Sequence, residues 1–128
     1  MKGYILNIEE ETLTNNDYRR VLYTAKNCQL VLMSIKPGDE IGEEVHKLDQ
    51  FIRIEGGCGK AIMDGIEHDL CSDHAIIVPA GMRHNVINTG DVDLKLYTVY
   101  APPEHKDGIV EHTKADEVEE HFDGVTTE

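Results

Sequence analysis

The sequence is poor in positively charged residues, in aromatic residues and in long hydrophobic segments. It has 12 Lys and Arg against 25 Asp and Glu, a formal net charge of -13, and it contains no Trp. A surface with so few cations is not suited to neutralising the phosphates of nucleic acid or of anionic lipid, so we expect neither partner. The longest apolar runs, residues 30–35 and 75–78, are far shorter than the about 20 residues of a membrane-spanning helix.

Cysteine is also scarce, with Cys28, Cys58 and Cys71 and no CXXC pair. This odd count favours three small core residues in a reducing compartment over a disulfide framework or a redox site. Residues 1–12 have neither the basic start nor the apolar stretch of a signal peptide. We therefore expect a cytoplasmic protein.

The middle of the chain shows short β-rich runs separated by turn signals, without a long stretch of helical apolar spacing. The predicted strands are residues 20–24, 29–36, 44–46, 50–56, 59–63, 66–70, 74–78, 84–88 and 94–100. Asp64 and Gly65 are the residue pair of a type I′ hairpin turn. This pattern predicts an all-β sandwich or barrel, and composition does not choose between the two.

Charged residues dominate the chain after Pro102 and Pro103. We therefore divide it into one β domain, residues 1–103, and a charged C-terminal segment, residues 104–128. Thr113 and Asp116 have the spacing of a helix cap, so a short helix to Glu120 is one expectation. A frayed acidic tail lying on the barrel is the other.

Two stretches carry recognisable motifs. Residues 38–57 read GDEIGEEVHKLDQFIRIEGG and resemble the first motif of the cupin superfamily, G(X)5HXH(X)3,4E(X)6G. Residues 73–88 read DHAIIVPAGMRHNVIN and resemble the second motif, G(X)5PXG(X)2H(X)3N, with Asp73 in place of its opening glycine. Two motifs in the correct order are more specific than either alone. The resemblance implies a jelly-roll (cupin) β-barrel followed by the short charged segment.

The resemblance places the family's metal ligands at four positions, Glu44, His46, Gln50 and His84. Glutamate replaces the first motif histidine here, and glutamine replaces the motif glutamate. Glu44 and His46 are two apart on an extended segment, so both point to one face. One carboxylate with two imidazoles is a ligand set of non-haem iron, and a divalent Fe, Mn, Ni or Zn ion would suit these donors. Four protein ligands leave two positions of an octahedral ion for water or substrate.

Each residue also has a purely structural interpretation. Glu44 lies in an acidic run typical of a solvated edge, and Gln50 follows a turn, while a lone histidine in a strand is often a hydrogen-bonded core residue. Tyr97, Tyr100 and His105 either line the barrel mouth or serve as packing residues. The histidines outside the motifs are expected at the surface or in the tail: His68, His74, His105, His112 and His121.

The chain resembles small single-domain cupins described as similar to type II phosphomannose isomerases. A phosphosugar requires Arg or Lys in the pocket. Strand alternation puts Arg53 on the outer face, Lys60 and Lys95 face solvent, and only Arg83 is expected near the pocket mouth. A neutral or aromatic substrate, or an acid bound directly to the metal, therefore suits the sequence better.

The leading prediction is a metal-dependent site for a small molecule, with isomerase or dioxygenase activity. A non-catalytic binding or sensor domain with the same metal is the main alternative, and a structural barrel without metal is a third. Small cupins commonly pair through their sheets, and residues 20–24 offer an edge strand, so we expect a homodimer.

Overall fold

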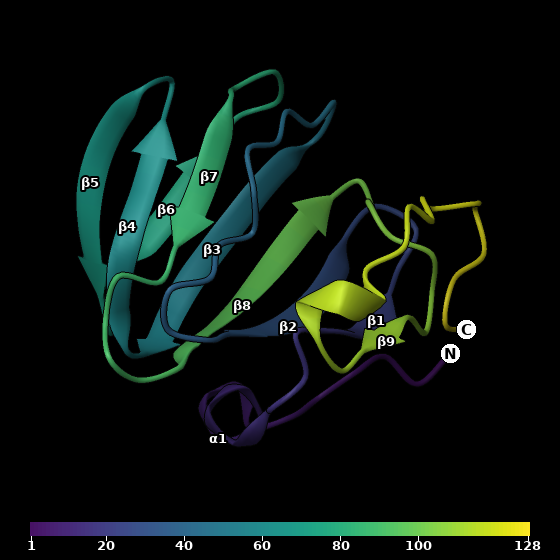
Figure 1. The fold of residues 1–128 in the computed structure, drawn as a ribbon. Coiled ribbons are helices and arrows are strands. Elements are labelled where there is room, and N and C mark those ends of the chain that lie inside the picture. Colours follow the sequence, from purple (N-terminus) through teal and green to yellow (C-terminus); the bar gives the residue numbers. More distant parts are fainter.

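Two antiparallel sheets form the body of the structure, a computed structural model of residues 1–128 (Figure 1). The larger sheet has six strands, in spatial order β6 (Ala75–Val78), β3 (Asp49–Gly56), β8 (Leu94–Ala101), β2 (Gln29–Ile35), β1 (Arg19–Thr24) and β9 (Val110–Glu111). The smaller sheet has three, in the order β5 (Ile66–Cys71), β4 (Cys58–Met63) and β7 (His84–Ile87). The predicted all-β jelly-roll barrel is confirmed.

The barrel interior is an apolar core of 16 residues contributed by both sheets. Strand β3 shows how the sequence builds it. Gln50, Ile52 and Ile54 are buried on one face of the strand, whereas Phe51 and Arg53 on the other face are partly exposed. The period-two alternation of the sequence therefore places Gln50 inside the barrel, as predicted.

The hairpin between β4 and β5 turns at Asp64 and Gly65, which both have positive φ, +48° and +80°. This is the backbone that a type I′ turn requires, and it explains the Asp-Gly pair. The turn fixes the register, so that Cys58 lies directly opposite Cys71.

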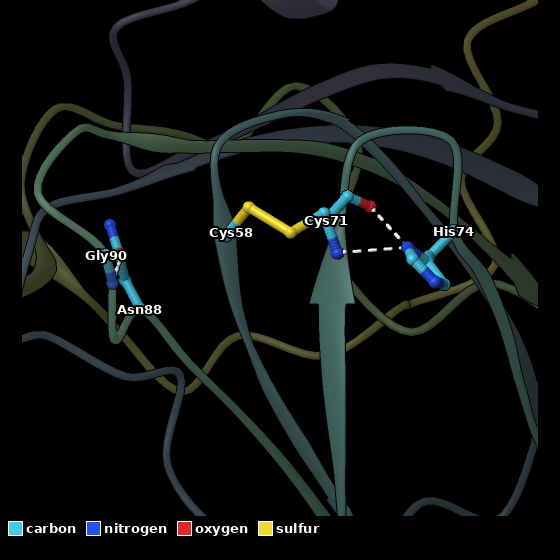
Figure 2. The surroundings of a disulfide bond; sticks show 5 residues. All are labelled: Cys58, Cys71, His74, Asn88 and Gly90. Carbon is cyan, nitrogen blue, oxygen red and sulfur yellow. Dashed lines mark hydrogen bonds between the residues drawn. A yellow bond between two sulfur atoms is a disulfide. The ribbon is translucent and has the colours of Figure 1, made fainter.

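Cys58 and Cys71 form a disulfide with a Cα–Cα distance of 4.1 Å, at the end of the hairpin remote from the turn (Figure 2). Cys28 is free and exposed. The interpretation of all three cysteines as small core residues was therefore wrong. Cysteine usage no longer supports a reducing compartment.

The predicted strand at residues 44–46 is reduced to an isolated bridge between Glu44 and His84. The Glu44 amide donates to the His84 carbonyl at 2.8 Å, and the His84 amide donates back at 2.9 Å. This pair, together with a second bridge between Glu40 and Ile87, joins the loop before β3 to β7. The two motif segments are therefore held together through the backbone.

A short helix that the sequence pattern did not predict, α1 (Ile8–Thr14), packs against β3 and β8 on the outside of the barrel. The Asn7 side chain caps it by accepting a hydrogen bond from the Glu10 amide at 3.0 Å. With only 7 residues the helix is too short for a periodic apolar signal. No helix in the structure has the length and apolar character needed to cross a membrane.

The charged C-terminal segment lies along the barrel and contributes β9 to the larger sheet (Figure 1). The expected helix is only a 3-10 turn, η1 (Lys114–Asp116), in which the Thr113 amide donates to Asp116 Oδ2 at 3.1 Å. The Thr127 amide donates to the Thr24 carbonyl at 2.9 Å. The outer edge of β1 is thus covered by this segment, and it is not the open edge strand expected for a dimer.

Candidate metal centre

The structure brings three of the four predicted ligands into one group. Glu44 and His46 come from the loop before β3, and His84 begins β7. The His46 and His84 rings lie 5.1 Å apart between centroids, and Glu44 Oε2 is 3.5 Å from His46 Nε2. Gln50 enters from β3, opposite Tyr100 on β8, and the Tyr100 ring contacts His46 at 5.8 Å between centroids.

Two buried atoms that could bind a metal have no hydrogen-bond partner at this site, His46 Nε2 and Gln50 Oε1. The Gln50 amide nitrogen donates to Thr98 Oγ1 at 3.0 Å, and Thr98 in turn donates to the Phe51 carbonyl. These hydrogen bonds occupy the amide nitrogen of Gln50, whereas its amide oxygen, Oε1, has no partner. An unsatisfied buried polar atom costs about 1–3 kcal/mol, so two of them in one place require an explanation, and an absent ion supplies one.

The histidine side chains are oriented in the manner of metal ligands. His84 Nδ1 lies 3.0 Å from the Met82 carbonyl. A proton on Nδ1 makes this contact a hydrogen bond and leaves the lone pair on Nε2 for an ion. His46 Nδ1 lies 3.7 Å from Glu104 Oε1, so a carboxylate stands behind this ring as well.

Burial controls the charge state of the site. It lowers the pKa of His46 to about 4, with neighbouring His84 adding to the effect, so the ring is neutral near pH 7. Burial also raises the pKa of Glu44 to about 7, against the opposing field of Arg19. A neutral imidazole is the form that binds metal.

The four candidate ligands suit a metal ion by the chemistry of their side chains, but they do not already form a coordination cluster. No three side chains of His, Cys, Asp or Glu lie close enough together to hold an ion as they stand. Side-chain adjustment is therefore needed, beginning with the Glu44–His46 contact. The donors themselves, one carboxylate, two imidazoles and an amide oxygen, suit a first-row divalent ion.

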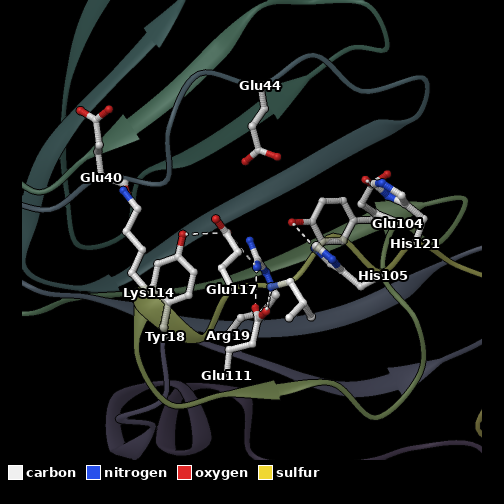
Figure 3. Close-up of polar contacts among 12 residues, drawn as sticks. Tyr18, Arg19, Glu40, Glu44, Glu104, His105, Glu111, Lys114, Glu117 and His121 are labelled. Atoms are coloured by element: carbon white, nitrogen blue, oxygen red, sulfur yellow. Dashed lines mark hydrogen bonds and ion pairs between the residues drawn. The ribbon is translucent and has the colours of Figure 1, made fainter.

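A polar pocket of about 300 Å³ opens beside Glu44, between the barrel and the C-terminal segment. Arg19 and Glu44 line it from the barrel, and Glu104, His105 and Glu117 line it from the C-terminal segment. Figure 3 shows Glu44 across this space from Arg19 and Glu117. A small molecule in the pocket would therefore contact both the metal-ligand group and the tail.

Arg19 is a functional candidate that the sequence interpretation missed. It is buried, with Nη1 2.6 Å from Glu111 Oε1 and 3.0 Å from Glu117 Oε2. Arg83, the cation expected at the pocket mouth, is instead exposed and paired with Glu43 at 3.6 Å. A buried arginine just before a predicted strand has no distinctive local pattern, and the acids that neutralise it lie more than ninety residues away.

Of the other basic residues, some lie where the sequence predicted and one does not. Arg53 lies on the outer face as expected, where it pairs with Asp73 at 3.0 Å, and Lys60 is exposed. Lys95 was expected to face solvent, but its side chain is largely covered and Nζ donates to the Asn15 carbonyl.

Tyr100 and His105 do lie at the site. Tyr100 is buried, and its ring contacts His105 at 5.1 Å between centroids. Tyr97 faces the other side of the sheet, against Phe51. His121 was expected only as a tail residue, but it pairs with Glu104 at 3.2 Å and lines the pocket. His68, His74 and His112 are exposed, as predicted.

The fold is that of a cupin, and comparison with known proteins agrees. The Cupin domain family (Cupin_2) matches residues 31–100, so the chain belongs to the cupin family. It is 47% identical over 124 residues to the uncharacterized protein YrkC of Bacillus subtilis (strain 168), covering 91% of this chain and 67% of YrkC.

Two solved structures illustrate the range of relatives. The crystal structure of BH2720 from Bacillus halodurans has a TM-score of 0.88 at 45% identity, covering 90% of this chain and 92% of that one. A predicted oxalate decarboxylase from Thermotoga maritima has a TM-score of 0.57 at 23% identity, covering 59% of this chain and 67% of that one. The second likeness shows the fold alone, and a fold does not determine an activity.

Proposed function

We propose that this cupin binds one first-row divalent metal ion through Glu44, His46, Gln50 and His84 and uses it on a small molecule in the adjoining pocket. The observation that carries the proposal is the pair of buried, unpartnered donor atoms, His46 Nε2 and Gln50 Oε1. Iron, manganese, nickel and zinc are all candidates, because nitrogen and oxygen ligands separate them poorly.

A metal ion bound here would act as a Lewis acid, with coordination positions open to a ligand. Two neighbouring side chains, Tyr100 and His105, provide hydrogen bonds without charge. Burial lowers the pKa of His105 to about 3 and raises the pKa of Tyr100 above its ordinary value, so both are neutral near pH 7. His105 Nε2 lies 3.4 Å from the Tyr100 hydroxyl, which keeps the two side chains together beside His46.

Within this proposal we favour an enzyme, an isomerase or a dioxygenase, over a binding or sensor domain. A phosphosugar isomerase is the least supported form, because the pocket lining contains only one Lys or Arg, and that residue, Arg19, already pairs with two carboxylates. Isomerisation of a carbonyl compound or dioxygen uptake with a substrate panel would identify an enzyme. Saturable binding without turnover would identify a sensor.

Metal content provides the first test. Protein purified without an affinity tag should contain up to one first-row ion per chain by elemental analysis. Adding iron, manganese, nickel or zinc to the metal-free protein should raise Tm, since a ligand at 100 times its Kd stabilises the folded state by about 2.7 kcal/mol. His84→Ala should abolish the shift, whereas His74→Ala, which removes an exposed histidine, should retain it. Absence of a Tm shift with every ion would overturn the proposal.

A further inference from the structure

Arg19 is the only Lys or Arg among the residues that line the pocket. Its guanidinium is covered by protein, with 4% of the side chain exposed. In a chain with a formal charge of -13, a buried cation facing the candidate metal site requires a specific reason.

The hydrogen bonds of Arg19 use only one part of its guanidinium. Both ion pairs, to Glu111 and to Glu117, leave from Nη1. Nε is buried without any partner, and Nη2 donates no hydrogen bond within the protein. Nη1 and Nη2 together form the end of a guanidinium, which can bind a carboxylate through two parallel bonds. Nη2 is unused, so a carboxylate that replaces Glu117 on Nη1 would gain a second bond to Nη2.

The two glutamates that pair with Arg19 differ in burial and in their other contacts. Glu111 is buried in β9, and its Oε2 also accepts a hydrogen bond from the Val118 amide at 2.8 Å, so it is part of the structure. Glu117 follows the 3-10 turn, its side chain is 38% exposed, and it lies at the rim of the pocket. Glu117 is held by this partly buried ion pair and by a hydrogen bond from the Tyr18 hydroxyl at 3.3 Å, without a backbone amide bond such as Glu111 has, so Glu117 is the more readily replaced partner.

We propose that Arg19 binds the carboxylate of a small organic acid, and that Glu117 takes the place of this carboxylate when the acid is absent. The inference deepens the proposed function, because Glu44 lies across the same pocket and an acid on Arg19 would be held beside the metal ligands (Figure 3). The anchoring itself requires no metal. A volume of about 300 Å³ limits the ligand to a small acid.

Binding of the acid requires the carboxylate of Glu117 to leave Nη1, and with it the neighbouring residues of the C-terminal segment to shift. Val118, Glu119 and Glu120 line the same wall of the pocket and are all exposed. Displacing them leaves β9 in place, since β9 ends at Glu111, but it breaks two hydrogen bonds, from the Val118 amide to Glu111 Oε2 at 2.8 Å and from the Lys106 amide to the Glu120 carbonyl at 3.4 Å. The C-terminal segment thus acts as an internal competitor for Arg19.

Isothermal titration of the full-length, metal-free protein with malonate tests this proposal, at fixed pH and about 0.15 M ionic strength to limit long-range repulsion. Malonamide, which has the same shape but no charge, is the control ligand. We expect saturable binding of malonate at one per chain and none of malonamide. Glu117→Gln should tighten malonate binding by at least about threefold to fivefold, because it removes the charge that competes for Arg19 in a partly buried ion pair. Arg19→Lys should weaken it at least tenfold, because lysine has no two-pronged edge.

Glu119→Gln is the matched control, since it removes one negative charge from the same wall without a contact to Arg19. An equal gain in Glu119→Gln and Glu117→Gln would overturn the proposal, as would unchanged affinity in Arg19→Lys or the absence of binding by both wild type and Glu117→Gln. If Arg19→Lys does not fold, the comparison of the two glutamate variants still decides. Metal content, measured separately on each variant, tests the proposed function independently of malonate binding.

Discussion

Replacing Gln50 by glutamate tests the candidate metal centre at the atom that most requires a partner. Gln50 Oε1 is buried and unpaired, and its position is where the cupin motif has a glutamate. With Glu44 as the only anionic ligand, a divalent ion would retain one net positive charge in a largely buried site. Gln50→Glu should therefore tighten metal binding, because a second carboxylate neutralises that charge.

The expected gain follows from two opposing terms. A carboxylate about 4 Å from one net positive charge gains about 4 kcal/mol at an effective dielectric constant of about 20. Moving the carboxylate charge out of solvent offsets about 2 kcal/mol or more of that. The remainder, at most about 2 kcal/mol, corresponds to a tightening of up to roughly thirtyfold. Gln50→Ala loses a neutral oxygen and should weaken binding about tenfold, or about 1.4 kcal/mol.

Glu44→Gln removes the only anionic ligand, so it should weaken binding more than Gln50→Ala does. Glu43→Gln is its matched control, because the neighbouring glutamate is exposed and its only ion pair is with Arg83. That variant should leave the affinity unchanged. The comparison separates loss of a ligand from a general loss of negative charge near the site.

Competition against a chelator of known affinity measures all four variants. The pH must be held fixed, because protons compete with the ion for the same ligands. If Gln50→Glu and Gln50→Ala both leave the affinity unchanged, Gln50 is not a ligand. The site would then consist of Glu44, His46 and His84 alone.

Three further predictions concern the fold and assembly. The Cys58→Ser and Cys71→Ser double variant should lose about 3 kcal/mol of stability, as expected for a disulfide that closes a loop of this length. Native, unreduced protein should show one reactive thiol, and three reactive thiols would contradict the disulfide. Gly59→Ala should cost about 2–4 kcal/mol in denaturant unfolding, because an added Cβ would lie 2.3 Å from the Ile87 carbonyl oxygen; wild-type stability would contradict this packing. Because the edge of β1 is covered, only the resemblance to small cupins supports a homodimer; light scattering coupled to size exclusion should give the dimer mass at micromolar concentration, and a monomer mass would reject it.

Much of the barrel could be predicted from the sequence because its signals are local. Alternation along residues 50–56 identified the buried face that carries Gln50, and Asp64 with Gly65 identified a hairpin turn. The motif spacing led to His84, and a backbone bridge holds the start of that strand to Glu44. Each of these features depends on residues close together in the chain or on a known pair of motifs.

The errors arose where distant residues meet or where two local signals had to be combined. Arg19 was missed because Glu111 and Glu117, which neutralise it, lie far along the chain in a segment interpreted as a tail. The disulfide had a usable signal, since Cys58 and Cys71 are placed symmetrically about the turn at Asp64 and Gly65, and a hairpin must bring them together. The cysteine count was interpreted without this hairpin pairing, and that led to the wrong prediction of three free core cysteines.

The pocket draws its walls from parts of the chain on either side of the region that defines the family. Residues 31–100 contain all four candidate ligands, whereas Arg19 precedes that region and Glu117 follows it. Substitutions in the flanks can thus reshape the pocket without altering the four candidate ligands. On the proposed function, relatives that share these ligands would differ in the compound they bind through the outer segments, and a comparison confined to the shared domain would miss that difference.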